Sequence, residues 1–509
     1  MTDRWWETAV VYQIYPRSFA DSNGDGVGDL PGITARLEHV AELGVDAVWL
    51  SPIYRSPMAD FGYDISDHCA VDELFGTLDD ADALIARAHD LGLRVVFDVV
   101  FNHTSDQHPW FQRARTGPGA AERGRYVWRR PGPDGGPPNN WRAAFGDIPA
   151  WTFDPSSGEY YLHLFLPEQP DLDWNHPDVP EAMADVLRFW MGRGVDGFRA
   201  DVIHCIGKDP ALPDAPEELA ALPACIFDHG PGTHDQLRFL REVVDAADRP
   251  TMLLGETYVL DRGQVRSYLG NDDELHLGFN IPALHAAWNA AAWRAELVDA
   301  EERYTGGAQP AWVLSNHDVV RHATRYGTES RARAAAVLLL CVRGTPFLYA
   351  GEELGLGDAE LTVTQRVDPG GRDGCRAPIP WDETEGHGWP APPWLPFPAG
   401  ADTHNVATEH RDAGSMLEHY RRLLRLRRST PALHRGNSEV LDAHPDVLRW
   451  RRTDAHGNAV EIEVNFVDEP RPSTSTGIWI GGTRSEQDAP PPGAPLAADE
   501  ARITAIELT

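Results

Sequence analysis

The sequence is poor in cysteine, in basic residues and in long apolar runs. Only 5 cysteines occur among 509 residues, and none forms a CxxC pair, so we expect a reducing compartment rather than a disulfide framework. Basic residues number 45 against 78 acidic ones, and the formal charge of −33 repels phosphate backbones and anionic lipids. No apolar run reaches the length of a membrane span or of a signal-peptide core. We therefore expect a cytoplasmic protein with no nucleic-acid or membrane partner.

What the chain does contain is an alternation of short apolar runs and amphipathic, helix-like segments. Its length of 509 residues predicts two or three domains. Eight apolar runs read as strands, and eight strands alternating with helices favour a closed (β/α)8 TIM barrel over an open doubly wound sheet. The eight runs are residues 10–16, 47–52, 94–100, 195–201, 252–256, 275–280, 312–318 and 345–351.

Two stretches interrupt this alternation. Residues 104–175 are rich in Pro, Gly, Trp and Asn and are typical of an irregular domain inserted after the third strand. Residues 431–509 contain alternating apolar positions, which predict a small C-terminal β-domain. The catalytic barrel is then expected to comprise residues 1–103 and 176–430.

Four acidic residues stand at or near the carboxyl ends of predicted strands: Asp98, Asp201, Glu256 and Asp318. A single acid at such a place is often a helix cap or a loop anchor. Four of them on separate strands of one barrel converge on one pocket, because the carboxyl ends of all strands meet at the same face. The pattern favours an active site.

Two of these acids differ in their sequence surroundings. Arg199 and Asp201 are two apart on a strand and face the same side, so the guanidinium is expected to lower the pKa of Asp201 and keep it ionised, as a nucleophile requires. A structural ion pair would explain the same spacing. Glu256 has no basic neighbour in sequence, and an apolar setting would raise its pKa and keep its proton. Such a pair, about 5–5.5 Å apart, is typical of retaining glycosidases.

A separate loop, Asp21–Asp29, carries oxygen-bearing side chains at alternate positions. This spacing suits a hard cation such as Ca²⁺ or Mg²⁺, although a polar turn would explain it too. Gly32 occupies the position where an EF-hand needs Glu. The candidate ligands are the side chains of Asp21, Asn23, Asp25 and Asp29 and the carbonyl of Val27.

Nine segments in order resemble the α-amylase family (glycoside hydrolase family 13), in its oligo-1,6-glucosidase and α-glucosidase branch. The segments are VVYQIYPRSFADSNGDGVGDL, DFGYDISDH, DVVFNH, PNNWRAAFG, EYYLHLFLPEQPDLDWN, GFRADVI, GETYV, SNHD and GRDGCRAPIPW. The resemblance covers nearly the whole chain and is weakest after about residue 431.

The resemblance implies a role for each matching position. Asp201 corresponds to the nucleophile, Glu256 to the general acid/base and Asp318 to the acid that stabilises the transition state. Asp60, Tyr63 and Arg376 would close the pocket at the non-reducing end. The loop Asp21–Asp29 would hold a structural Ca²⁺, and no organic cofactor is implied. The expected substrate-binding residues are Asp60, Tyr63, His103, Phe145, Phe165, Gln169, Arg199, His317 and Arg376.

The implied activity is that of a retaining exo-acting α-glucosidase on short malto- or isomalto-oligosaccharides. Val202 matches members that act on α-1,6 bonds, whereas Asp173 and residues 203–210 depart from that pattern, so the linkage stays open. A glucosyltransferase or isomerase of the same family, of the trehalose synthase or sucrose isomerase type, is the nearest alternative. A non-enzymatic interaction protein on the same barrel is a remote one. The sequence indicates no oligomeric state.

Overall fold

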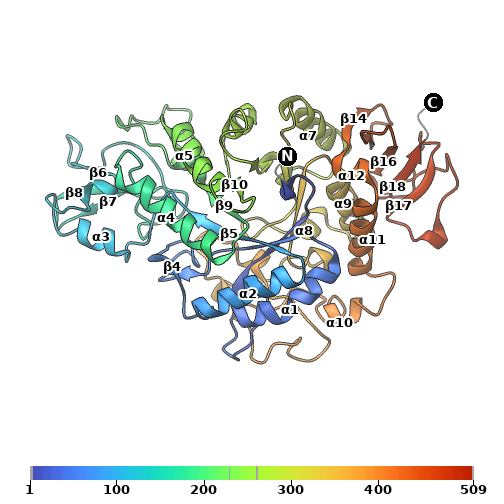
Figure 1. The fold of residues 1–509 in the computed structure, drawn as a ribbon, viewed down its shortest axis with the longest axis horizontal. Helices are drawn as coiled ribbons and strands as arrows, with labels where there is room; N and C mark the ends of the chain where they lie inside the picture. The colour runs from blue at the N-terminus through green and yellow to red at the C-terminus, as the bar shows by residue number, and fades with distance from the viewer. Residues whose placement is uncertain (1–3, 228–229, 260–261, 507–509) are drawn as a thin grey trace.

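The centre of the molecule is a barrel of eight parallel strands (Figure 1). The computed structural model describes residues 4–227, 230–259 and 262–506. A parallel bridge between Phe279 and Ala311 joins the two ends of the eight-stranded sheet, which confirms the predicted (β/α)8 class. The strands are β1 (Val11–Ile14), β2 (Ala47–Leu50), β5 (Arg94–Val100), β9 (Gly197–Asp201), β10 (Met252–Gly255), β11 (Leu277–Gly278), β12 (Ala311–Val313) and β13 (Thr345–Tyr349).

Side chains along each barrel strand alternate between the barrel interior and the helical layer. In β5, Val96 belongs to the interior cluster, whereas Val95 and Phe97 pack in the layer shared with the helices. Asp98 is two residues after Val96, so its side chain faces the interior as well. There, Trp49 of the interior cluster donates from Nε1 to Asp98 Oδ2 at 3.2 Å. Because of this alternation, every second side chain faces the interior, and acids at these positions near the strand ends point into the barrel mouth.

Helices surround the barrel, and local capping sets where they begin and end. In α1 (Leu30–Leu43), the Asp29 side chain accepts a hydrogen bond from the backbone of the first turn, and Gly44 ends the helix with a left-handed φ of 100°. The other helices of the barrel region are α2 (Leu78–Asp90), α4 (Asp178–Arg193), α5 (Thr233–Asp245), α6 (Ile281–Leu284), α7 (Ala290–Arg303), α8 (His322–Tyr326), α9 (Glu329–Cys341), α10 (Val406–Glu409), α11 (Met416–Ser429) and α12 (Pro431–Arg435).

The segment between β5 and α4 is more regular than expected. It contains α3 (Pro109–Ala114) and an antiparallel sheet in the order β6-β8-β7. Phe111 of α3 lies against Trp128 and Tyr161 of that sheet, with ring centroids 5.6 and 5.0 Å away, so aromatic packing supports strands too short to stand out in the sequence. These strands are β6 (Trp128–Arg129), β7 (Trp151–Asp154) and β8 (Glu159–Leu162); a separate pair is β3 (Tyr54–Arg55) and β4 (Asp67–Val71).

A five-stranded antiparallel sheet, in the order β14-β15-β16-β18-β17, lies at the opposite end of the molecule from the insert (Figure 1). Arg452 of β15 is buried against the barrel and donates to the carbonyls of Cys341 and Gly436 at 2.8 and 2.9 Å. The strands are β14 (Asn437–Leu441), β15 (Val447–Thr453), β16 (Ala459–Asn465), β17 (Ile478–Gly482) and β18 (Ala501–Ile506). The predicted limits of the three domains stay predictions.

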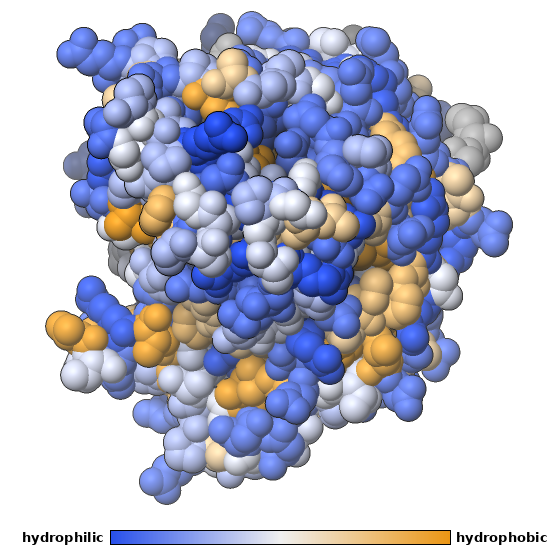
Figure 2. Space-filling view, turned by 90° about the vertical axis from the view of Figure 1, so that its left-hand side faces the viewer, coloured by the Kyte–Doolittle hydropathy of each residue, from blue (hydrophilic) through white to orange (hydrophobic). Residues whose placement is uncertain are grey.

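The face that carries the insert is mainly hydrophilic, with small separate hydrophobic patches (Figure 2). Among the residues that the structure describes, no helix combines the length and the apolar character needed to cross a membrane.

Candidate active site

The four strand-end acids meet at the mouth of the barrel. Asp201 is the last residue of β9, Glu256 follows β10 directly, and Asp318 lies in the loop after β12. These three line one cavity of about 370 Å³, which is within the size range of sites for small ligands. Asp98 lies in the neighbouring strand β5, beside Asp201. The barrel therefore gathers acids that are far apart in the sequence, as predicted.

Arg199 is the centre of this group of acids. Its Nη1 donates to Asp98 Oδ1 at 2.8 Å and to Asp201 Oδ1 at 2.7 Å, and its Nη2 donates to Glu256 Oε2 at 2.6 Å. The side chain is 2% exposed. One buried cation thus faces three carboxyl groups, and it holds the side chains of Asp201 and Glu256 next to each other.

Burial and the nearby acids change the protonation of Asp201 that the sequence led us to expect. Burial raises the pKa of Asp201 well above its ordinary value; Arg199 acts in the opposite direction, and Glu256 and Asp98 reinforce the rise. Burial also raises the pKa of Asp98 to about 6. Arg199 lowers the pKa of Asp201 as predicted, but burial outweighs it, so the expected net lowering of this pKa is wrong.

The expected apolar setting of Glu256 is also wrong. Besides Arg199, the backbone N–H of Val202 donates to Glu256 Oε2 at 3.1 Å. Val202 has a left-handed backbone, with φ 35° and ψ 41°, a conformation that a β-branched residue adopts only under strain of about 1–3 kcal/mol. The strained turn after Asp201 aims that N–H at Glu256, so the first residue of the loop links the two acids.

Asp318 has a different environment from the other two acids. Burial would raise its pKa, but the His317 ring, 3.2 Å away, together with Arg372 and Arg376, outweighs burial and holds the pKa of Asp318 below its ordinary value. Arg372 Nη1 donates to Asp318 Oδ1 at 3.0 Å. Asp318 is therefore an ionised carboxylate over the whole neutral pH range.

Arg372 is the functional residue that the sequence reasoning missed. Its Nη2 donates to Asp60 Oδ1 at 2.6 Å, its Nη1 reaches Asp318, and its guanidinium lies 4.9 Å from the centre of the Phe145 ring. It bridges one wall of the cavity to the other. Its position in the GRDGCR segment, four residues before the predicted Arg376, could have identified it from the sequence.

The remaining predicted residues lie in the cavity wall or directly behind it. Gln169 Nε2 donates to Asp60 Oδ2 at 3.1 Å and is 3.0 Å from His103 Nε2, and Arg376 Nε donates to the His317 carbonyl at 2.8 Å. Burial lowers the pKa of His103 to about 3, so its ring is neutral. The predicted residues that line the cavity are Asp60, Tyr63, His103, Phe145, Phe165, Asp201, Glu256, His317 and Asp318; Gln169, Arg199 and Arg376 support them.

Residues 13–436 match the model of the alpha amylase catalytic domain. The chain belongs to the alpha-amylase family and is a glycoside hydrolase. It is 42% identical over 487 residues to the Probable alpha-glucosidase of Rhizobium meliloti (strain 1021), covering 89% of this chain and 88% of that protein. It is 35% identical over 514 residues to the Oligo-1,6-glucosidase of Halalkalibacterium halodurans, covering 92% and 91%. The structure of a trehalulose synthase from Pseudomonas mesoacidophila MX-45 superposes with a TM-score of 0.92 at 32% identity, over 99% of each chain.

The outer side of the glycosidase pocket is mainly apolar and was not predicted. The Tyr258 hydroxyl pairs with His285 Nε2 at 2.9 Å, and His204 Nε2 lies 2.8 Å from the Cys225 carbonyl. These polar groups are therefore directed at protein atoms. The residues that line this side are Ala144, Val202, His204, Pro223, Cys225, Ile226 and Tyr258.

In the loop Asp21–Asp29, carboxylates accept hydrogen bonds from the backbone. Asp21 Oδ1 accepts from the N–H groups of Asn23 and Gly24 at 3.0 and 2.7 Å, and Asp29 serves as the cap of α1. Within the described ranges, no group of three or more His, Cys, Asp or Glu side chains is arranged to hold a metal ion. The five predicted ligands share a loop, but their carboxylates do not converge.

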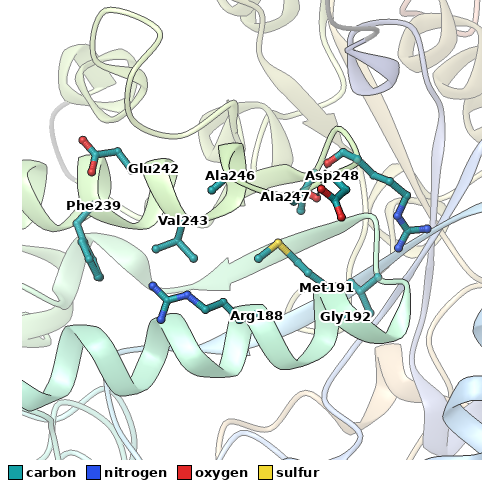
Figure 3. Close-up of a pocket in the computed structure, with 12 residues that line it drawn as sticks. Arg188, Met191, Gly192, Phe239, Glu242, Val243, Ala246, Ala247 and Asp248 are labelled. Carbon is teal, nitrogen blue, oxygen red and sulfur yellow. Dashed lines mark hydrogen bonds between the residues drawn. The ribbon is translucent and has the colours of Figure 1, made fainter.

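A second cavity, of about 800 Å³, lies outside the barrel between α4 and α5 (Figure 3). Met191 and Arg188 of α4 face Phe239 and Val243 of α5 across it. None of the four strand-end acids lines this cavity. The glycosidase chemistry therefore belongs to the smaller pocket at the barrel mouth.

Proposed function

We propose that this glycoside hydrolase is a retaining, exo-acting α-glucosidase that releases glucose from the non-reducing end of short α-glucosides. The observation that carries the proposal is the shared contact of Asp201 and Glu256 with the guanidinium of Arg199, inside a cavity that also contains Asp318. A guanidinium that bonds both carboxyl groups keeps them close enough for a double displacement, which needs a separation of about 5–5.5 Å.

In the proposed mechanism, Asp201 attacks the anomeric carbon while Glu256 protonates the leaving oxygen. A covalent glucosyl-enzyme forms, and Glu256 then removes a proton from water, which attacks with net retention. The raised pKa of Asp201 reflects burial together with the negative charge of Glu256 and Asp98. Once Glu256 holds the proton that it donates, less negative charge faces Asp201, and the nucleophile ionises more readily.

The wall formed by Asp60, Arg372 and Asp318 supports exo action. Arg372 bonds Asp60 and Asp318 at 2.6 and 3.0 Å, so a chain of ionic contacts closes one end of the pocket. Asp318, His103 and His317 are proposed to bind glucose hydroxyls more tightly as the ring flattens toward its oxocarbenium-like state. A blind pocket of this kind accepts one terminal glucose unit.

Deletion of the proposed nucleophile tests this function. Wild type is expected to release glucose from p-nitrophenyl α-glucoside, and Asp201→Ala is expected to lose activity by at least about four orders of magnitude. Asp185→Ala, on the exposed face of α4, is the matched control and should retain wild-type activity. Equal rates for wild type and Asp201→Ala would refute the assignment.

A second candidate is an enzyme that transfers glucose to a sugar rather than to water. The trehalulose synthase is similar over the full chain, and the chemistry is shared until the second step. The charged RLDRD loop of the sucrose isomerase type is absent from residues 319–327, which favours hydrolysis. Product analysis on maltose, isomaltose and sucrose separates the two, because a transferase yields new disaccharides while a hydrolase yields free glucose.

We also propose that the loop Asp21–Asp29 binds a structural cation of the Ca²⁺ type. The alternate spacing of its oxygen donors supports the proposal. In the structure, Asp21 Oδ1 accepts from the backbone N–H groups of Asn23 and Gly24. No catalytic step depends on this ion. We expect the melting temperature to rise with CaCl₂ and not with MgCl₂, and we expect the Asp25→Ala variant to lack this response. A melting temperature that responds to neither salt would refute the site.

We also propose a cytoplasmic location. No disulfide joins any of the five cysteines, all of which lie within the described ranges, and this suits a reducing compartment. Fractionation of producing cells tests it: activity in the periplasmic or secreted fraction would contradict the proposal.

A further inference from the structure

A buried acid that the proposed mechanism does not use lies near the segment that leads from β12 to Asp318. Glu352 begins the short helix η7 (Glu352–Leu354) after β13 and is 2% exposed. Neither of its carboxyl oxygens has a partner at hydrogen-bond geometry among the residues described. Its neighbour Glu353 is satisfied, since the Tyr12 hydroxyl donates to Oε1 at 2.6 Å and the Gly351 N–H donates to Oε2 at 2.9 Å.

Three elements pack polar groups around Glu352, but among the residues that the structure describes no Lys or Arg forms an ion pair with it. His322 Nδ1 of α8 is 3.7 Å from Glu352 Oε1, and burial lowers the pKa of His322 to about 3, so that ring is neutral. Arg321 donates instead to the carbonyls of Ala350 and Cys375. The groups that face Glu352 are Ser315 after β12, Arg321, His322 and Tyr326 of the α8 region, Glu353 of η7, and Tyr420 of α11.

Ser315 connects this buried group to the active site. Its Oγ accepts from the His322 N–H at 2.8 Å and lies 2.9 Å from His322 Nδ1. Ser315 stands three residues before Asp318, and Asn316 Oδ1 accepts from the Asp318 N–H at 2.9 Å, so the segment between them is a tight turn. A change in the direction of Ser315 would therefore displace Asp318.

We propose that Glu352 is a positioning residue: its carboxyl packs against the His322 ring, and through His322 and Ser315 it fixes the turn that presents Asp318 to the substrate. This inference rests on the role proposed for Asp318. A neutral carboxyl offers both a donor and an acceptor to the hydroxyls around it. An ionised one would be a buried charge without a partner, and the group would rearrange to solvate it.

The protonation of Glu352 supports this geometry. Burial raises the pKa of Glu352 to about 8, so the folded protein keeps the carboxyl neutral at neutral pH. Because the folded pKa is raised, the stabilisation by this group is fully present below the ordinary pKa of a glutamate and is lost as the pH rises through about 8. Positioning of Asp318 is expected to fail over the same alkaline range.

Two substitutions separate positioning from a merely structural role. Glu352→Gln keeps a neutral group of the same shape, so its kcat/KM on p-nitrophenyl α-glucoside should match wild type at neutral pH and fall less steeply above about pH 8. Glu352→Leu removes the polar partner, and kcat/KM should fall on the order of tenfold without a lower Tm, because a buried acid is replaced by an apolar side chain. Glu353→Gln is the control: it should lower Tm and leave the pH profile unchanged.

A second variant covers the case in which Glu352→Leu does not fold. Ser315→Ala should lose a similar factor in kcat/KM. Where Glu352→Leu does fold, the double variant of Ser315→Ala and Glu352→Leu should lose no more than the larger single effect. Identical pH profiles for wild type and Glu352→Gln, or wild-type kcat/KM in Glu352→Leu, would overturn the inference. An inactive wild type would instead overturn the proposed α-glucosidase function, so the two failures are distinguishable.

Discussion

Replacement of Arg199 by Met is the perturbation that probes the active-site electrostatics most deeply. The guanidinium makes charge-assisted hydrogen bonds of 2.6–2.8 Å to Asp98, Asp201 and Glu256, and each such bond contributes about 1.5–3 kcal/mol. Without the cation, the pKa of Asp201 rises further, and each unit of rise lowers the ionised fraction about tenfold below that pKa. We expect Arg199→Met to lose about 3 kcal/mol of transition-state stabilisation, or roughly 10²-fold in kcat/KM.

The sign of the pH effect distinguishes this explanation from simple disruption. Removal of a cation favours the protonated carboxyl, so the acid limb of the kcat/KM profile should move to higher pH, and part of the activity should return as the pH rises. Arg199→Lys keeps the charge but lacks the second Nη group, so a smaller displacement is expected. Folding of both variants should be checked before the kinetics, because loss of the cation leaves three buried acids unpaired and costs about 3–5 kcal/mol of folding stability. An unchanged acid limb in Arg199→Met would refute the reasoning.

Three further predictions follow from the contacts. Arg372→Met should raise KM and lower kcat/KM about 10–100-fold in steady-state kinetics, because two ionic contacts to the pocket wall are lost. Arg366→Met, at an exposed position, should leave both constants unchanged. Val202→Gly should relieve a strained φ of 35° and change the ratio of kcat/KM for isomaltose over maltose by less than about 200-fold; an unchanged ratio would show that this side chain does not read the linkage. Arg452→Met should destabilise the protein by about 1–3 kcal/mol, because buried carbonyls lose their donors; urea unfolding with an unchanged midpoint would contradict this.

Regular periodicity explains why the barrel and its acids were predictable. Asp98 and Asp201 lie within barrel strands and Glu256 directly follows one. Side chains along these strands alternate between interior and helical layer, so residue parity directs the three acids into the mouth. Helical segments were predicted because apolar positions recur at helical spacing, as in α5 with Leu237, Leu240 and Val244. The sheet of the insert was missed, since its strands are two to four residues long and depend on aromatic partners from α3.

The rest of the site depends on contacts that no local pattern encodes. Arg372 lies in an irregular loop, and only the folded chain brings it to Asp60, 312 positions away. The protonation of Asp201 was mispredicted because burial outweighs Arg199, and two further acids, Asp98 and Glu256, add to the rise in its pKa. A sequence reveals adjacent charges, but it does not reveal how many distant charges share one partner.

Trapping of the glycosyl-enzyme tests the central claim most directly. Wild type incubated with 5-fluoro-α-D-glucosyl fluoride and digested with protease should yield one labelled peptide by mass spectrometry, with the sugar esterified to Asp201, because this carboxylate is proposed as the nucleophile. A label on any other residue, or complete turnover with an inverted anomeric product and no labelled peptide, would contradict the account.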